Sequence, residues 1–212
     1  MLDKVESKLG IERIKIMTLE YRVIHLLTVF GAFALLFTGV GSFPGSPKTL
    51  LHIELGIASI VVLAGYGVYL LAICQVRLFD GLRKPISDQI REAKAILVNY
   101  VASVSIPLNI RRGLARYNVL ASYVTILLAI GFGELAISGV SLMFLAPGTA
   151  LFDSMLGIHI FGVGLVALFF LLHFFAVLSG ENRPLLRAVF TNGKVPLNWA
   201  LDHMAKFLDK KR

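Results

Sequence analysis

The chain has 212 residues, of which 57% are hydrophobic and 16% charged, and its formal net charge is +8. This composition lies far from that of an average soluble domain and excludes an ordinary globular protein. The basic residues are dispersed along the segments that flank apolar runs, so they do not form the clustered basic patch that binds nucleic acid. A single cysteine, Cys74, excludes an internal disulfide and an iron–sulfur cluster held by this chain alone, and we expect it to be a packing residue.

Four apolar runs are each long enough to cross about 30 Å of hydrocarbon as a helix of about 20 residues. The first run lacks an obvious signal cleavage site and follows a charged segment, so we interpret it as a retained span. The sequence therefore predicts an all-α transmembrane four-helix bundle, forming a single membrane domain over residues 1–212. The predicted spans are residues 21–42, 51–75, 118–145 and 152–179.

Lysine and arginine alternate in density along the chain. Residues 1–22 hold five, residues 75–118 hold eight and residues 180–212 hold seven, whereas the connections at 43–50 and 146–153 hold one and none. The positive-inside bias then predicts that the N-terminus, the middle segment and the C-terminal tail are cytoplasmic. Within the middle segment, ISDQIREAKAILVNYVASV has the spacing of an amphipathic helix at the cytoplasmic interface, although a docking surface for a partner would look similar.

Four of the five histidines lie in or at the ends of the predicted spans, at His25, His52, His159 and His173. His25 lies near the cytoplasmic start of the first span, and His173 lies about one and a half turns before the fourth span returns to that side. His52 begins the second span on the outer side, and His159 follows the outer start of the fourth. The histidines therefore form two pairs, one at each of two membrane depths.

The spacing of His159 and His173 turns their side chains to within about 40° of each other on an ideal helix and separates them by ~21 Å. Two imidazole pairs at two depths can ligate two six-coordinate, low-spin haem irons. Because the chain has no CxxCH motif, each haem would be a non-covalently bound haem b. Zinc is disfavoured, because two ligands per level fall short of its usual four. The alternative is that each histidine hydrogen-bonds across a helix interface, but four that pair by depth favour a functional role.

Other residues accompany these histidines. Arg22 lies on the same helix face as His25 and is predicted either to pair with a haem propionate or to be an ordinary interface arginine. Glu134, near the middle of the third span, is expected either to take part in proton movement or haem tuning, or to be a satisfied helix–helix hydrogen-bonding group. Glycines in three spans would make room for a macrocycle or for close helix packing: Gly31, Gly39, Gly41, Gly56, Gly157, Gly162 and Gly164.

Five motifs carry a resemblance to a known family. They are RVIH in the first span, LLH at the start of the second, RYN before the third, the histidine spacing in the fourth, and the tail TNGKVPLNWALDHM. Over nearly its whole length the chain resembles the cytochrome b (gamma) subunit of respiratory formate dehydrogenases. That subunit belongs to a wider group of dihaem cytochromes b that also serves hydrogenases and thiosulfate reductases.

The resemblance implies that His25 and His173 ligate a cytoplasmic-side haem b, and that His52 and His159 ligate an outer haem b. Electrons would arrive from an iron–sulfur subunit of a dehydrogenase, hydrogenase or reductase and would reduce a quinone, menaquinone or ubiquinone, near the cytoplasmic haem. Asn118 of RYN matches an asparagine implicated in quinone binding in this family, although the chain lacks the glutamine often found three residues later. The alternative for Asn118 is a helix N-cap.

The expected function is therefore that of a membrane-anchoring electron-transfer subunit in a prokaryotic cytoplasmic membrane, rather than a complete enzyme. One alternative is a free-standing cytochrome b561-like quinol oxidoreductase, and another is a haem-free assembly or transport protein. The family carries a second tail histidine where this chain has Met204, so we expect the remaining His203 to be structural or partner-facing rather than a ligand.

Overall fold

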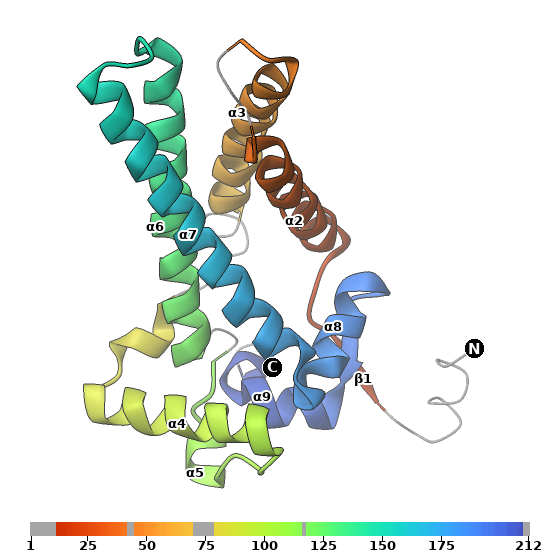
Figure 1. The fold of residues 1–212 in the computed structure, drawn as a ribbon. Helices are drawn as coiled ribbons and strands as arrows, with labels where there is room; N and C mark the ends of the chain where they lie inside the picture. Colours follow the sequence, from red (N-terminus) through yellow and green to blue (C-terminus); the bar gives the residue numbers. More distant parts are fainter. Residues whose placement is uncertain (1–11, 42–44, 70–78, 116–117, 210–212) are drawn as a thin grey trace. The chain divides into compact units, whose positions relative to one another are not determined.

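The structure, a computed structural model, describes residues 12–41, 45–69, 79–115 and 118–209. Four of the described helices are long and apolar enough to cross a membrane: α2 (Leu19–Gly39), α3 (Pro47–Val68), α6 (Val119–Phe144) and α7 (Ala150–Leu178) (Figure 1). Many of their large apolar side chains are exposed, including Phe37 at 77% and Phe144 at 82%. Such a surface is suited to lipid rather than to water. The prediction of an all-α protein with four spans is confirmed.

The other described elements are shorter: β1 (Arg13–Lys15), η2 (Asp80–Arg83), α4 (Ile86–Ala102), α5 (Leu108–Arg111), η3 (Gly180–Asn182), α8 (Arg183–Phe190), β2 (Lys194–Pro196) and α9 (Leu197–Asp209). The chain divides into two compact units. The span unit comprises residues 23–76 and 125–171, and the tail unit comprises residues 1–22, 77–124 and 172–212. Helices α2, α6 and α7 contribute to both units, and the predicted organisation as one domain stays a prediction.

Helix α3 begins earlier than the sequence predicted. The Ser46 hydroxyl accepts a hydrogen bond from the Thr49 backbone N–H at 3.1 Å, and Pro47 occupies the first turn. A serine cap followed by proline is a strong start signal, because the cap satisfies a free N–H and proline has none to satisfy. The helix therefore starts at Pro47 rather than at the predicted residue 51.

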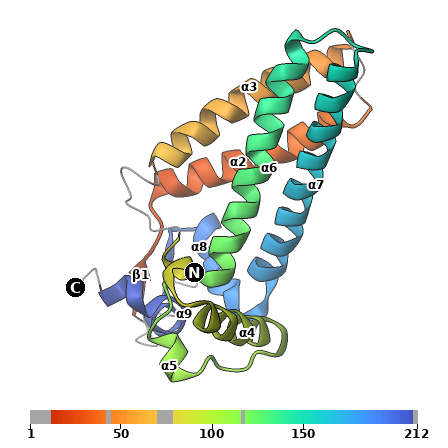
Figure 2. The ribbon, with the colours of Figure 1, turned by 90° about the vertical axis from the view of Figure 1, so that its left-hand side faces the viewer.

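Glycines allow the helices of the span unit to approach closely. In Figures 1 and 2, α6 and α7 run side by side. A Cβ atom added to Gly131 of α6 would lie 3.0 Å from Val166 Cγ2, and one added to Gly162 of α7 would lie 3.1 Å from Leu135 Cγ. Close packing through small residues is how helices associate where lipid removes the hydrophobic driving force. Of the two roles expected for Gly162, the structure supports helix packing.

Helix α4 has its apolar face exposed and its polar face buried. Exposed apolar residues recur along one side of the helix, including Ile86, Ile90, Leu97 and Val101. On the buried side, the Gln89 amide accepts from the Tyr123 hydroxyl at 2.8 Å, and Glu92 accepts from the Val119 backbone N–H at 3.0 Å and pairs with Lys84. The predicted amphipathic helix is confirmed, and its outward apolar face is the one that an interfacial helix turns to lipid.

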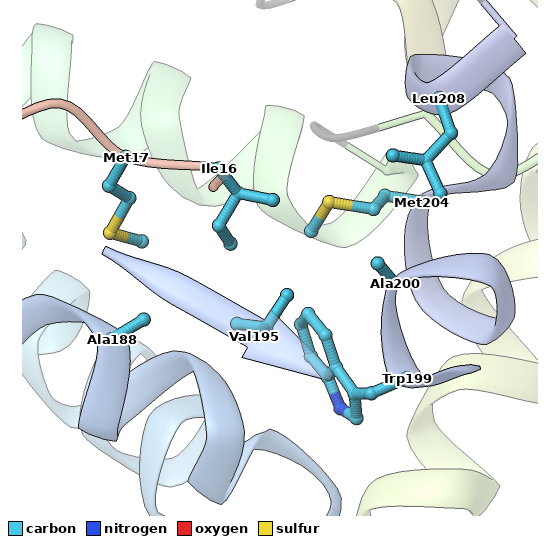
Figure 3. Close-up of a cluster of buried hydrophobic side chains, with 8 residues drawn as sticks. All are labelled: Ile16, Met17, Ala188, Val195, Trp199, Ala200, Met204 and Leu208. Carbon is cyan, nitrogen blue, oxygen red and sulfur yellow. The ribbon is translucent and has the colours of Figure 1, made fainter. Parts of the chain in front are cut away.

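The N-terminal segment and the C-terminal tail form one small core within the tail unit. Strand β1 pairs antiparallel with β2, with Ile14 opposite Val195. Eight buried side chains gather around this pair (Figure 3): Ile16, Met17, Ala188, Val195, Trp199, Ala200, Met204 and Leu208. The sequence predicted the tail but not the two strands, because three-residue strands show no usable periodicity.

Gly193 lets the chain just before β2 approach closely the residues that follow β1. Its carbonyl accepts from the backbone N–H groups of Ile16 at 2.9 Å and Met17 at 3.2 Å. Its φ is +74°, and a Cβ atom placed on it would collide with the Met17 carbonyl oxygen. Both the backbone conformation and the close approach therefore require glycine here.

We predict that Gly193→Ala, in the tail unit, lowers the stability of the protein far more than Gly148→Ala, in the span unit. Gly148 also has a positive φ, of +82°, but a Cβ atom there meets nothing within 4 Å. Both substitutions carry the left-handed backbone cost of roughly 1–2 kcal/mol, and only Gly193→Ala adds the collision. Thermal unfolding of the detergent-purified protein measures the difference, and equal losses of stability in the two variants would contradict the role given to Gly193.

Candidate haem-binding histidines

The structure brings together one of the two predicted histidine pairs. His52, on α3, and His159, on α7, both belong to the span unit, and their ring centroids are 6.2 Å apart with the ring planes at 78°. The two residues are far apart in the sequence and lie on different helices. Their convergence is therefore a property of the helix packing rather than of local sequence.

This separation fits one metal ion held between the two rings. Bonds from imidazole nitrogen to a transition metal are about 2.0–2.1 Å long, so two such bonds and two ring radii of roughly 1.1 Å give about 6.3 Å between centroids. The donor set, two neutral imidazoles, is also one that haem iron accepts as its axial ligands. Among the described residues, no group of three or more histidine, cysteine or acidic side chains gathers to hold a metal ion.

Each of these histidines is held by a hydroxyl group on a neighbouring helix. His52 Nδ1 lies 3.0 Å from Thr38 Oγ1 of α2, and His159 Nδ1 lies 3.0 Å from Ser138 Oγ of α6. Both hydroxyl residues are buried, Thr38 at 5% exposed and Ser138 at 0%. Water therefore has little access to compete for the same ring nitrogens.

The residue after each hydroxyl is a glycine that lies against the same histidine ring. A Cβ atom added to Gly39 would lie 3.1 Å from His52 Cε1, and one added to Gly139 would lie 3.3 Å from His159 Cε1. Gly39 was a candidate in the sequence, but Thr38, Ser138 and Gly139 were not. A signal for them was present, because TGV at residues 38–40 and SGV at residues 138–140 repeat the same pattern near the same ends of two spans.

The second predicted pair, His25 and His173, is not tested by the fold. His25 belongs to the span unit and His173 to the tail unit, where its ring centroid lies 6.1 Å from that of Phe174. Their roles as ligands of a second haem iron stay a prediction.

The remaining candidates have partners in the described structure. The Arg22 guanidinium donates to the Thr191 backbone carbonyl, which ties the start of α2 to the tail; the propionate role stays a prediction. The Asn118 side-chain oxygen accepts from the Ala121 backbone N–H at 3.0 Å. This bond is the helix N-cap that was the alternative for Asn118, and it does not occupy the amide nitrogen of the side chain.

Glu134 lies on α6 one turn before Ser138, whose hydroxyl donates to the Glu134 backbone carbonyl. Its side-chain Oε2 atom is buried and has no hydrogen-bond partner among the described residues. The helix–helix hydrogen bond that was one expectation for Glu134 is therefore absent at this oxygen, and the role in proton movement or haem tuning stays a prediction.

Of the two roles expected for His203, structural or partner-facing, its contacts in the tail unit support the structural one. Its ring stacks on the Trp199 indole with centroids 4.6 Å apart at 11°, and its Nδ1 atom donates to the Trp199 carbonyl at 2.9 Å. Burial lowers the pKa of His203, so the ring is neutral near neutral pH. The expectation for Cys74 falls outside the described residues.

Comparisons with known proteins bear on the family of this chain. A family model described as prokaryotic cytochrome b561 matches residues 16–192, which include the four long helices and all four histidines of the predicted pairs. A comparison with curated proteins gives no match. The family match covers most of the chain and supports a haem b-binding electron-transfer cytochrome of the membrane. The chain belongs to the prokaryotic cytochrome b561 family of integral membrane cytochromes.

Proposed function

We propose that this cytochrome passes electrons between an iron–sulfur partner subunit and the quinone pool through two haem b groups. The observation that carries the proposal is the convergence of His52 and His159, from two different helices, at 6.2 Å. Membership in a haem-binding family disfavours the haem-free assembly or transport alternative.

Four histidines would hold the two groups. His52 and His159 would be the axial ligands of one iron, and His25 and His173 those of the other. Haem b, when bound, supplies a one-electron redox centre. The histidines of this chain would fix its position, and two imidazoles on each iron would leave no open coordination site, which favours electron transfer over oxygen chemistry.

Asn118 is the residue we assign to the quinone. Its side-chain oxygen is used by the cap of α6, so its NH₂ group is the part that would donate to a quinone carbonyl. The residue also directly precedes α6, which is long and apolar enough to cross a membrane, and a quinone headgroup at such a helix end would meet water for protonation. One residue would thus perform both roles that the sequence left open.

The partner assignment rests on the resemblance to formate dehydrogenase gamma subunits and on the folded tail. In the tail unit, Arg111 pairs with Asp202 at 2.8 Å, which fixes the middle segment to the C-terminal helix α9. A folded unit outside the membrane spans is expected of a subunit that docks onto a larger complex. The free-standing cytochrome b561-like quinol oxidoreductase is the second candidate, because the description of the matching family model shares the name cytochrome b561.

Purification from native membranes separates these two candidates. We expect an affinity-tagged chain, extracted in mild detergent, to bring with it iron–sulfur protein in near-stoichiometric amount, detectable as labile iron and sulfide. A chain that migrates alone, carries its full haem content and oxidises quinol would contradict the partner assignment and support the free-standing cytochrome.

In a potentiometric titration, the variants in which one histidine is replaced should fall into two classes. His52→Ala and His159→Ala should abolish the same redox component, because each removes an axial ligand of the same iron. His25→Ala and His173→Ala should abolish the other component. His203→Gln is the matched control, since His203 lies in the tail core, and it should keep both components. If His25→Ala and His52→Ala abolished one common component, the assignment would be wrong.

Asn118→Asp should preserve the fold and both haem groups while slowing quinone reduction, because aspartate keeps the capping oxygen but loses the amide donor. Asn118→Ala should in addition lose about 1 kcal/mol of stability with the cap. Quinone reduction by the reduced protein is followed by haem reoxidation in the presence of a soluble quinone analogue. An unchanged rate in Asn118→Asp, with both haem groups present, would leave Asn118 a cap alone.

A further inference from the structure

The direction of the two hydroxyl–histidine hydrogen bonds follows from the other bonds of the same hydroxyls. Thr38 Oγ1 lies 2.8 Å from the Ala34 carbonyl oxygen, and Ser138 Oγ is bonded to the Glu134 carbonyl oxygen. A carbonyl has no proton to give, so the hydroxyl must be the donor in each of these bonds. Each hydroxyl has only one proton, and that proton is used.

The same hydroxyl oxygen can therefore only accept from the histidine. His52 Nδ1 and His159 Nδ1, each 3.0 Å from its hydroxyl, must then carry the proton. A neutral imidazole has one protonated nitrogen, so Nε2 of both rings keeps a free lone pair. In this way the Ala34 carbonyl of α2 determines the tautomer of His52 on α3. The Glu134 carbonyl of α6 does the same for His159 on α7.

We propose that Thr38 and Ser138 are positioning residues of the cytochrome, which hold His52 and His159 in the tautomer and orientation that direct both Nε2 atoms to one haem iron. This inference rests on the proposed function of the two histidines as ligands of the same iron. The two hydroxyls lie on different helices and act on different rings, so the proposal is carried by two independent contacts rather than one.

The glycines after the hydroxyls complete the arrangement. Gly39 and Gly139 present no side chain to the rings, and a Cβ atom added to them would lie 3.1 Å from His52 Cε1 and 3.3 Å from His159 Cε1. The hydroxyl holds Nδ1 while the neighbouring glycine leaves room for the ring. The dipeptides Thr38-Gly39 and Ser138-Gly139 therefore make equivalent contacts, the first with His52 and the second with His159.

A hydrogen bond from Nδ1 also affects the iron through the ring. It makes Nε2 a better electron donor, which favours the ferric over the ferrous state and lowers the reduction potential. Because the acceptor is a neutral hydroxyl rather than a carboxylate, the ring remains neutral and the effect is moderate. Removing the hydroxyl should raise the potential of this haem and loosen its binding.

The test uses variants that remove or keep the hydroxyl, together with controls on the same helices. Thr38→Val and Ser138→Ala remove it, and Thr38→Ser and Ser138→Thr keep it. The controls are Thr28→Val on α2, where Oγ1 donates to the Ile24 carbonyl at 2.9 Å, and Ser141→Ala on α6, where Oγ donates to the Ile137 carbonyl at 2.8 Å. Each control loses a similar intrahelical bond, but its hydroxyl makes no hydrogen bond to a histidine among the described residues.

We expect Thr38→Val and Ser138→Ala to shift the potential of the haem component assigned to His52 and His159 upward and to weaken its retention by about 10–100-fold, the usual effect of losing an outer partner of a metal-binding histidine. The component assigned to His25 and His173 should not shift. Thr38→Ser, Ser138→Thr and both controls should give the wild-type potential. Potentiometric titration and the rate of haem transfer to apomyoglobin measure these effects.

Two different failures can be told apart. If neither His52→Ala nor His159→Ala removes a haem component, the ligand assignment fails and the positioning role fails with it. If both remove the same component, but Thr38→Val and Ser138→Ala match their controls in potential and haem retention, the positioning role alone is overturned. Should Thr38→Val not accumulate in the membrane, Ser138→Ala decides the question, because it lies on a different helix and acts on a different histidine.

Discussion

The site depends on the need of an imidazole within a membrane span for a defined hydrogen-bond partner. Lipid offers none, and a buried polar atom without a partner costs about 1–3 kcal/mol. The chain meets this need with Thr38 and Ser138, whose own protons are committed to helix carbonyls. These two hydroxyls lie 3.0 Å from the Nδ1 atoms of His52 and His159. Close packing at Gly131 of α6 and Gly162 of α7 keeps these two helices together.

Much of the span unit could be predicted from the sequence, because the bilayer imposes simple rules on length and polarity. Apolar runs gave four helices, and the depth of His52 and His159 along their spans predicted that they would meet. The hydroxyl partners could not be identified this way. Whether Thr38 or Ser138 faces a histidine depends on the rotation of each helix about its axis, and apolar spans carry almost no amphipathic pattern to fix that rotation.

The tail unit was less predictable for a different physical reason. Its core joins residues near both ends of the chain through two three-residue strands, and Gly193 permits their close approach. Such long-range pairing leaves no local periodicity to detect. The amphipathic character of α4 was visible in the sequence, but the exposure of its apolar side was not. It follows from buried polar contacts such as that of Glu92 with Val119.

We propose that His52 and His159 bind one and the same iron. The most direct measurement is the haem content per chain, by the pyridine haemochrome assay, of the His52→Ala/His159→Ala double variant beside the two single variants and the unaltered protein. Two ligands of one iron predict that the unaltered protein holds two haem groups and that all three variants hold one. A double variant with no haem, beside single variants with one each, would show that the two histidines serve different irons and would contradict the account.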